Sequence, residues 1–132
     1  MAKADEEKYS KVRMSSREMN KIAKSMDEYI KENKLYLKAD IKMSDIASGL
    51  GMSPSVLSQV FALHMKQSYY DYINTMRIAE FKRKIAKGEH NKLTIKAISE
   101  ECGFKKTSFF SAFRKLEGLT PTEYIKGVKV KK

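Results

Sequence analysis

The segment "IASGLGMSPSVLSQVF", residues 46–61, is followed 52 positions later by a second segment of the same pattern, "ISEECGFKKTSFFSAF", residues 98–113. The match needs no gap, and it falls on apolar residues at helical spacing and on a glycine. Identical residues in and beyond the two segments pair Ile46 with Ile98, Gly51 with Gly103, Phe61 with Phe113, Tyr72 with Tyr124 and Ile73 with Ile125. Self-similarity at a fixed period indicates two copies of one structural unit.

Each copy has the pattern of two short helices joined by a sharp turn. In the second copy Thr94 is a favourable N-cap, and the apolar run behind it ends at Gly103, where a left-handed residue stops a helix at little cost. In the first copy Gly51 holds the same place, and the next helix opens with Ser53 as cap and Pro54 as its first residue. The sequence therefore predicts two helix-turn-helix units.

The adjacent phenylalanines of the second copy indicate which side of its second helix is buried. Phe109 and Phe113 are four residues apart and share the inward face, so Phe110, about 100° round the helix, lies on the outer face. The outer faces of the two copies are Thr107, Phe110, Ser111 and Arg114 in the second, and Ser55, Ser58, Gln59 and Ala62 in the first. Small, uncharged, hydrogen-bonding side chains in a basic surround suit a helix that enters the major groove of DNA.

Helices are also predicted before and between the two copies. Ser15 and Glu18 have capping-box spacing and open a helix whose apolar stripe we expect to pack on the first unit rather than to form a coiled coil. The segment 68–89 has apolar residues on more than one side, as expected of a helix that connects the two units. Arg77 within it is expected to pair with an acid, such as Asp45 or Asp71, more readily than with phosphate.

The chain is thus predicted to be all-α, with about seven helices in two helix-turn-helix subdomains joined by a long linker helix. The expected divisions are a mobile leader (1–14), a leading helix with the first helix-turn-helix (15–67), the linker helix (68–89), the second helix-turn-helix with a closing helix (90–127) and a mobile basic tail (128–132).

The net charge of +11 is unevenly distributed along the 132 residues. Residues 1–33 hold eight Lys and Arg against seven Asp and Glu, and the other 99 residues hold nineteen against nine. A compact domain this basic attracts polyanions, chiefly nucleic acid or an anionic membrane, although a well-solvated lysine-rich surface gives the same composition.

Several function classes lack their residues in this sequence. No apolar run is long enough to cross a membrane, and the start "MAKADEEKYSK" is not a secretory signal. Cys102 matches the apolar Leu50 of the first copy, which indicates a buried, inert thiol, and His64 and His90 lack zinc-site spacing. We expect neither enzyme activity nor a cofactor.

In combination, these segments resemble the C-terminal DNA-binding domain of AraC/XylS-type transcription regulators over residues 15–126. The similar stretches are "EYIKEN" at 28–33, "IASGLGMSPSVLSQVF", "DYINTMRI", "IKAISEECGF" and "FRKLEGLTPTEYIK". The resemblance implies a monomeric module that contacts two neighbouring major-groove segments on one face of double-stranded DNA.

By position in the family, the base-contacting residues would be Ser55, Ser58 and Gln59 in the first unit and Lys106, Thr107, Phe110 and Ser111 in the second. The cations expected to contact phosphate are Lys42, Lys96, Lys105, Arg114 and Lys115. The expected setting is the cytoplasm, with RNA polymerase or an attached sensor domain of a longer parent as partner.

The chain departs from the family pattern at several positions. Family members often have arginine where Gln59 and Ser111 stand, and glycine where Lys66 stands. Many also have one residue more between the second glycine and the final phenylalanine, so the turn around Lys105 to Thr107 is expected to be tighter. The opening "MA" favours a chain cut from a longer regulator over a stand-alone form.

Two alternatives remain open from the sequence. The missing arginines favour an architectural DNA-binding module with little sequence preference. Phe110, Tyr69 and Tyr70 favour a helical protein-interaction module if their rings lie at the surface rather than within the domain.

Overall fold

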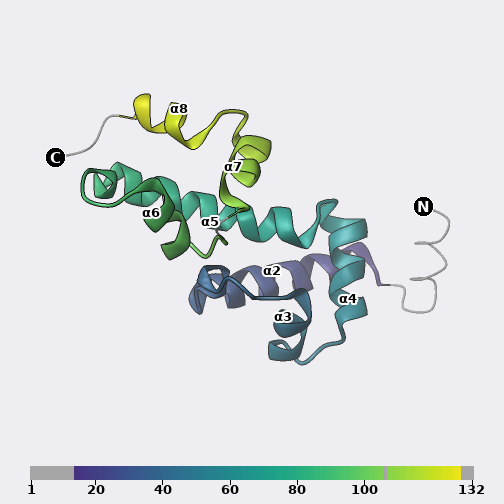
Figure 1. The fold of residues 1–132 in the computed structure, drawn as a ribbon. Helices are drawn as coiled ribbons and strands as arrows, with labels where there is room; N and C mark the ends of the chain where they lie inside the picture. Colours follow the sequence, from purple (N-terminus) through teal and green to yellow (C-terminus); the bar gives the residue numbers. More distant parts are fainter. Residues whose placement is uncertain (1–13, 106, 129–132) are drawn as a thin grey trace. The chain divides into compact units, whose positions relative to one another are not determined.

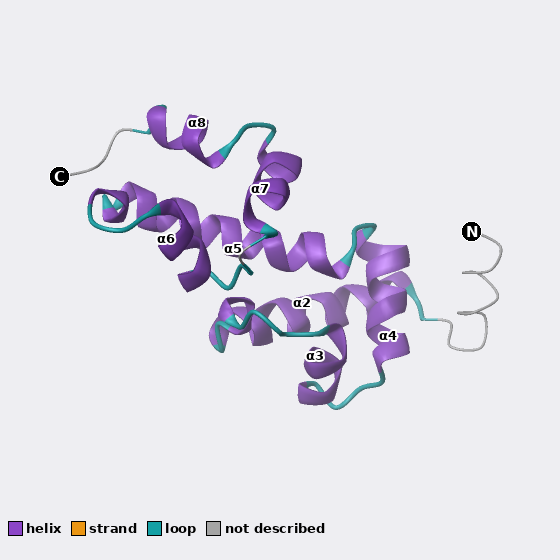
Figure 2. Cartoon of the chain, in the orientation of Figure 1, coloured by secondary structure: helices purple, strands orange, loops and turns teal. Residues whose placement is uncertain are grey.

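The computed structural model describes residues 14–105 and 107–128, and within them every regular element is a helix (Figure 2). The predicted leader and basic tail lie outside these residues apart from Met14 and Val128. The seven α-helices of the described part are α2 (Ser16–Glu32), α3 (Met43–Gly49), α4 (Pro54–Gln59), α5 (Tyr69–Ala86), α6 (Ile95–Glu101), α7 (Phe109–Glu117) and α8 (Pro121–Lys126) (Figure 1). The predicted all-α fold with about seven helices is confirmed.

Three shorter helical turns complete the described part: the 3₁₀ turns η1 (Leu35–Leu37) and η3 (Glu89–Asn91), and the π-helical turn η2 (Val60–Met65). No single helix there is long and apolar enough to cross a membrane. One sharply bent pair, Met43–Gly49 with Pro54–Met65, has the necessary length and apolar content only when both halves are taken together.

The chain divides into two compact units. The first contains α2 to α4 and η2, up to Tyr69, and the second contains α5 from Tyr70 on with α6 to α8. The segment Leu35–Asp40 interrupts the first unit in sequence but packs with the second. Its attachment is explained by Arg77 of α5, which donates hydrogen bonds to the carbonyls of Tyr36 (2.7 Å) and Lys38 (2.9 Å).

The first unit is organised by the apolar stripe of α2. The predicted capping box is present, with Ser15 Oγ accepting from the Glu18 N–H and Glu18 Oε1 accepting from the Ser15 N–H. Met26 and Ile30 of this helix are fully buried, and α2 packs within its own unit as predicted. Tyr69 closes the unit, because its ring meets Phe61 edge-on at 5.8 Å and its hydroxyl donates to the Ile41 carbonyl.

The second unit has an aromatic core. The Phe81 ring of α5 lies 4.9 Å from Phe109 and 5.6 Å from Phe113, centroid to centroid. The buried cluster also contains Ile98 of α6 and Cys102, the residue that follows this helix, together with Ile78, Ile85 and Phe104. The predicted inward direction of Phe109 and Phe113 is therefore confirmed, and so is the apolar position of Cys102.

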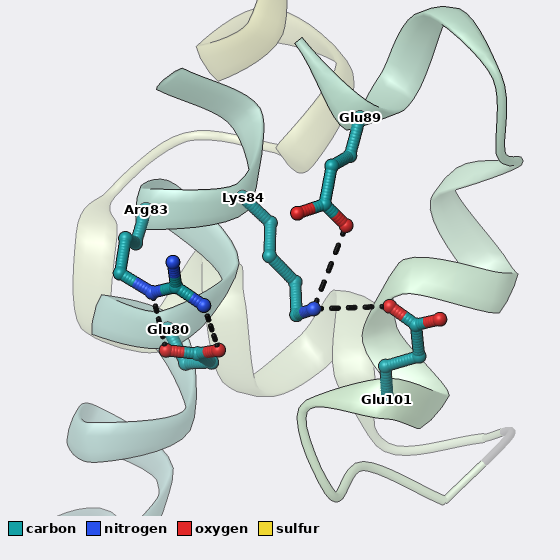
Figure 3. A network of polar contacts seen from close by, with 5 residues as sticks. All are labelled: Glu80, Arg83, Lys84, Glu89 and Glu101. Carbon is teal, nitrogen blue, oxygen red and sulfur yellow. Dashed lines mark hydrogen bonds and ion pairs between the residues drawn. The ribbon is translucent and has the colours of Figure 1, made fainter. Parts of the chain in front are cut away.

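Ion pairs surround the α5–α6 side of this core (Figure 3). Lys84 Nζ lies 3.1 Å from Glu101 and 3.5 Å from Glu89, and the bond to Glu101 raises the pKa of Lys84. Arg83 pairs with Glu80 through two nitrogens. Burial raises the pKa of the Cys102 thiol to about 12, so this thiol is uncharged at neutral pH and lacks the thiolate that nucleophilic chemistry needs.

Candidate nucleic-acid interface

The helix α7 presents a polar stripe opposite its buried phenylalanines. Phe110, Ser111 and Arg114 of α7 are exposed, and so is Thr107, which lies in the turn just before the helix. The stripe forms because Phe109 and Phe113 fix the inward face, which turns the intervening positions toward solvent. Ser111 Oγ donates to the Ser108 carbonyl at 3.2 Å, so its proton is used and the hydroxyl can act as an acceptor. The stripe supplies hydrogen-bonding groups, one aromatic ring and one cation.

Phe110 is exposed over 52% of its surface, although its position is fixed on one side. Its ring lies edge-on to Phe109, 5.5 Å between centroids with an interplanar angle of 72°. Phe109 in turn packs on Phe81. An edge-to-face contact with a fully buried ring restricts the motion of the exposed one. Phe110 is thus the surface end of a row of packed rings.

The outer face of α4 carries fewer polar groups than the sequence predicted. Ser55 is exposed, and its hydroxyl lies 3.3 Å from that of Ser53. Ser58 is half-buried, while Ala62 on the following turn is exposed. The predicted Pro54 at the first helical position is present, and Ser53 is the N-cap residue.

Gln59 does not lie at the surface, so its predicted exposure on the outer face was wrong. Only 1% of the residue is accessible, and neither Nε2 nor Oε1 has a hydrogen-bond partner among the described residues. The prediction assumed a regular repeat of 3.6 residues per turn. That repeat holds through α4 (Pro54–Gln59), and the π-helical turn η2 begins only after Gln59, so Gln59 is buried because its side of α4 is covered by the protein.

Replacing Gln59 by methionine, a side chain of similar shape without amide atoms, is expected to raise the free energy of unfolding by about 1 kcal/mol. The reason is that a buried amide without partners has lost its hydration. Urea unfolding followed by circular dichroism measures the change. The exposed Gln67 provides the control, since Gln67→Met should alter stability by only a few tenths of a kcal/mol. A lower free energy of unfolding for Gln59→Met would show that the amide of Gln59 makes a stabilising hydrogen bond.

The predicted phosphate contacts fall into two groups. The side chains of Lys42, Lys96 and Arg114 are exposed. Lys105 pairs with Asp40 at 3.0 Å, and Lys115 pairs with both carboxylate oxygens of Asp71 at 3.0 Å. Surface ion pairs are worth about 0–1 kcal/mol, so phosphate can displace these carboxylates at little cost. Lys106 lies outside the described residues.

Arg77 has a structural role that sequence reasoning missed. Besides the two carbonyls of the 35–40 segment, it donates to Asn74 Oδ1 at 3.1 Å and lies 5.7 Å from the Phe104 ring centre. The sequence did contain a signal that Arg77 is buried. Arg77 lies four residues from Ile73 and four from Phe81, so it shares a helical face with these two apolar residues. A charged residue in that position must be buried with partners of its own.

The two units share one local design. Each has a short helix, a glycine in the left-handed region (Gly51 at φ +70°, Gly103 at φ +97°) and a second helix with a buried apolar face. The sequence profile of a helix-turn-helix domain matches residues 46–127, which include both of these pairs of helices. The chain belongs to the AraC-type helix-turn-helix family. Domains of this family are DNA-binding domains of bacterial transcription regulators.

Relatives of this AraC-type domain include an uncharacterised helix-turn-helix transcriptional regulator, YtdP, of Bacillus subtilis, which is 30% identical over 66% of the chain. A second uncharacterised regulator, YpdC of Escherichia coli, is 34% identical over 60% of the chain. The regulatory protein PocR of Salmonella typhimurium is 27% identical over 67%. The chain spans only 11%, 27% and 29% of the lengths of these three proteins, respectively.

A solved structure of a protein of unknown function from Listeria innocua has the same fold. The TM-score is 0.68, with 22% identity over 82% of this chain and 98% of the other. This likeness supports the arrangement of helices in the AraC-type domain, and the functional assignment comes from the family.

Proposed function

We propose that this domain recognises a specific double-stranded DNA sequence by inserting α4 and α7 into two neighbouring segments of the major groove. The observation that carries the proposal is the exposed stripe of α7, which combines hydrogen-bonding groups with Arg114 on the second helix of a helix-turn-helix unit. Second helices of this motif place their N-terminal residues against base edges. The acceptor and donor groups of the stripe match the polar edges of the major groove.

The base contacts that we propose are Ser55 and Ser58 from α4, Thr107 from the turn before α7, and Phe110 and Ser111 from α7, with Lys106 retained from the sequence. Gln59 is left out, because its amide is buried. The phosphate contacts that we propose are Lys42, Lys96, Lys105, Arg114 and Lys115. They keep the domain on the duplex, and the uncharged hydroxyls between them supply the sequence preference.

A selection from random duplex DNA tests this function. The chain is incubated at about 0.15 M salt, where non-specific contacts are screened, and bound duplexes are sequenced through several rounds. Two short enriched boxes about one helical turn apart are expected, since each recognition helix covers one major-groove segment. One enriched box would limit base recognition to a single helix. No enrichment would overturn the proposal.

One observation favours architectural DNA binding as a second candidate. With Gln59 buried, α4 offers only two serine hydroxyls to base edges, and one of them is half-buried. If α7 also contributes little to base recognition, phosphate contacts dominate, and the selection gives weak enrichment or none despite measurable affinity.

Replacing Arg114 by alanine is expected to weaken binding to all duplexes alike and to lower the salt slope, log Kd against log salt concentration, by about one unit. The exposed guanidinium of Arg114 releases about one counterion when it contacts phosphate. Fluorescence anisotropy titrations over a range of salt concentrations measure the slope. Arg83→Ala is the control, because Arg83 is paired with Glu80 in the free protein. An unchanged slope in Arg114→Ala would exclude the phosphate contact.

We also propose that the domain works within a longer regulator in the cytoplasm, with an attached sensor domain or RNA polymerase as partner. The supporting fact is that the chain spans less than a third of each of the three regulators to which it is similar.

A further inference from the structure

We propose that Phe110 recognises the 5-methyl group of thymine, so that the domain distinguishes thymine from uracil and from unmethylated cytosine at one or two positions of its site. The inference rests on the proposed function and extends it, by assigning a chemical target to one side chain that forms no hydrogen bond through its ring.

The position of Phe110 brings its ring to the part of α7 that meets the bases. The helix begins at Phe109, so Phe110 is its second residue, and N-terminal residues of a recognition helix contact base edges. Ser111 and Arg114, on the same exposed face, supply polar contacts beside the ring. The apolar ring of Phe110 therefore lies beside side chains that are suited to contact polar base edges and phosphates.

The chemistry of the major groove leaves one partner for such a ring. Of the four bases only thymine presents a methyl group there, whereas adenine, guanine and cytosine present donors, acceptors and single C–H groups. A phenyl ring set against a polar edge would remove hydration without replacing it. When the ring packs against the methyl group, the ring and the methyl group both bury apolar surface, which is favourable.

The packing of Phe110 prepares this contact in the free protein. The edge-to-face contact with Phe109 holds the ring on one side, while 52% of the residue stays open to solvent. Less side-chain entropy is lost on binding when the ring is already restricted. A ring placed only to stabilise the domain would be covered by it, as Phe109 and Phe113 are.

The experiment replaces each thymine of the selected duplex, one at a time, by deoxyuridine, which removes the methyl group and keeps every donor and acceptor. We expect affinity to fall about fourfold at one or two thymines, as follows from the burial of a single methyl group. Phe110→Ala should bind the thymine duplex and the deoxyuridine duplex with equal affinity. That affinity should be no higher than the affinity of the parent for the deoxyuridine duplex. Phe110→Leu should keep part of the discrimination, because leucine is also apolar.

Matched controls separate this role from folding and from general aromatic effects. Tyr70 is an exposed aromatic residue on α5, outside the recognition helix, and Tyr70→Ala should keep the full response to deoxyuridine. Urea unfolding of Phe110→Ala and Phe110→Leu checks that both variants are as stable as the parent.

The outcomes distinguish the inference from the function on which it rests. If the parent binds a selected sequence but tolerates deoxyuridine everywhere, the methyl contact is wrong and sequence recognition stands. If Phe110→Ala still discriminates, another side chain makes the contact, and the assignment is overturned. If no sequence is selected at all, the proposed function fails and the inference fails with it.

Discussion

Replacing Gly103 by alanine is expected to lower the free energy of unfolding by about 3 kcal/mol or more. Gly103 has φ +97°, a left-handed conformation that costs an L-residue about 1–2 kcal/mol. A Cβ there would also lie 2.5 Å from the Tyr36 carbonyl oxygen and 3.0 Å from Arg77 Nε. The carbonyl belongs to backbone that Arg77 holds in place, so it cannot move aside without loss of that hydrogen bond. Overpacking of this kind costs about 1–3 kcal/mol more.

The internal repeat supplies the control for this prediction. Gly51 is the equivalent glycine of the first unit, with φ +70°, but a Cβ there meets nothing within 4 Å. Gly51→Ala should therefore cost only the backbone strain, about 1–2 kcal/mol. Urea unfolding of both variants by circular dichroism gives the comparison. Equal losses at the two glycines would show that the close approach of Tyr36 is not a real constraint.

Replacing Arg77 by methionine is expected to destabilise the protein by about 2–4 kcal/mol. The substitution keeps an apolar stem on the buried face of α5 and removes three hydrogen bonds, those to the carbonyls of Tyr36 and Lys38 and to Asn74 Oδ1. Only 7% of Arg77 is exposed, so water cannot easily replace the lost donors. The segment Leu35–Asp40 is expected to loosen first, and hydrogen exchange of its amides would detect this.

Two further variants make the Arg77 prediction specific. Arg83 lies six residues later on α5, and Arg83→Met should cost only a few tenths of a kcal/mol, because its pair with Glu80 is a surface one. Arg77→Lys keeps the charge but lacks the planar fork that reaches both carbonyls, so most of the loss should remain. If Arg77→Met and Arg83→Met had the same free energy of unfolding, the hydrogen bonds from Arg77 to segment Leu35–Asp40 would not stabilise the protein as proposed.

Much of the local structure followed from the sequence, because short-range chemistry fixes it. Thr94 caps α6 by accepting from the Ala97 N–H, and Ser15 with Glu18 caps α2, since each needs only neighbours along the chain. The interior position of Phe109 and the exposure of Phe110 followed from helical spacing alone. Lys66, noted as a departure from glycine, does take a left-handed conformation at φ +53° where η2 ends.

Errors in the sequence reasoning arose where packing from elsewhere in the chain intervenes. Gln59 was expected at the surface because helical spacing places it opposite the buried Leu57, but that side of α4 is covered too. Arg77 donates hydrogen bonds to two backbone carbonyls and an amide oxygen, and no spacing rule could identify these partners. The phosphate contacts of Lys105 and Lys115 stay predictions, but their ion pairs with Asp40 and Asp71 could not be foreseen, because those acids lie far away in sequence.

By itself, the sequence determined the two helix-turn-helix units, the caps and glycine turns, and the stripe of α7 that faces solvent. These depend on periodicity and on groups within a few residues of one another. Only the tertiary structure decided that Gly103 touches the Tyr36 carbonyl, that Gln59 is buried without partners, and that segment 35–40 joins the second unit. The contacts of Gly103 and of segment 35–40 join residues 39 positions apart or more, and the burial of Gln59 depends on what packs around α4, so local spacing encodes none of them.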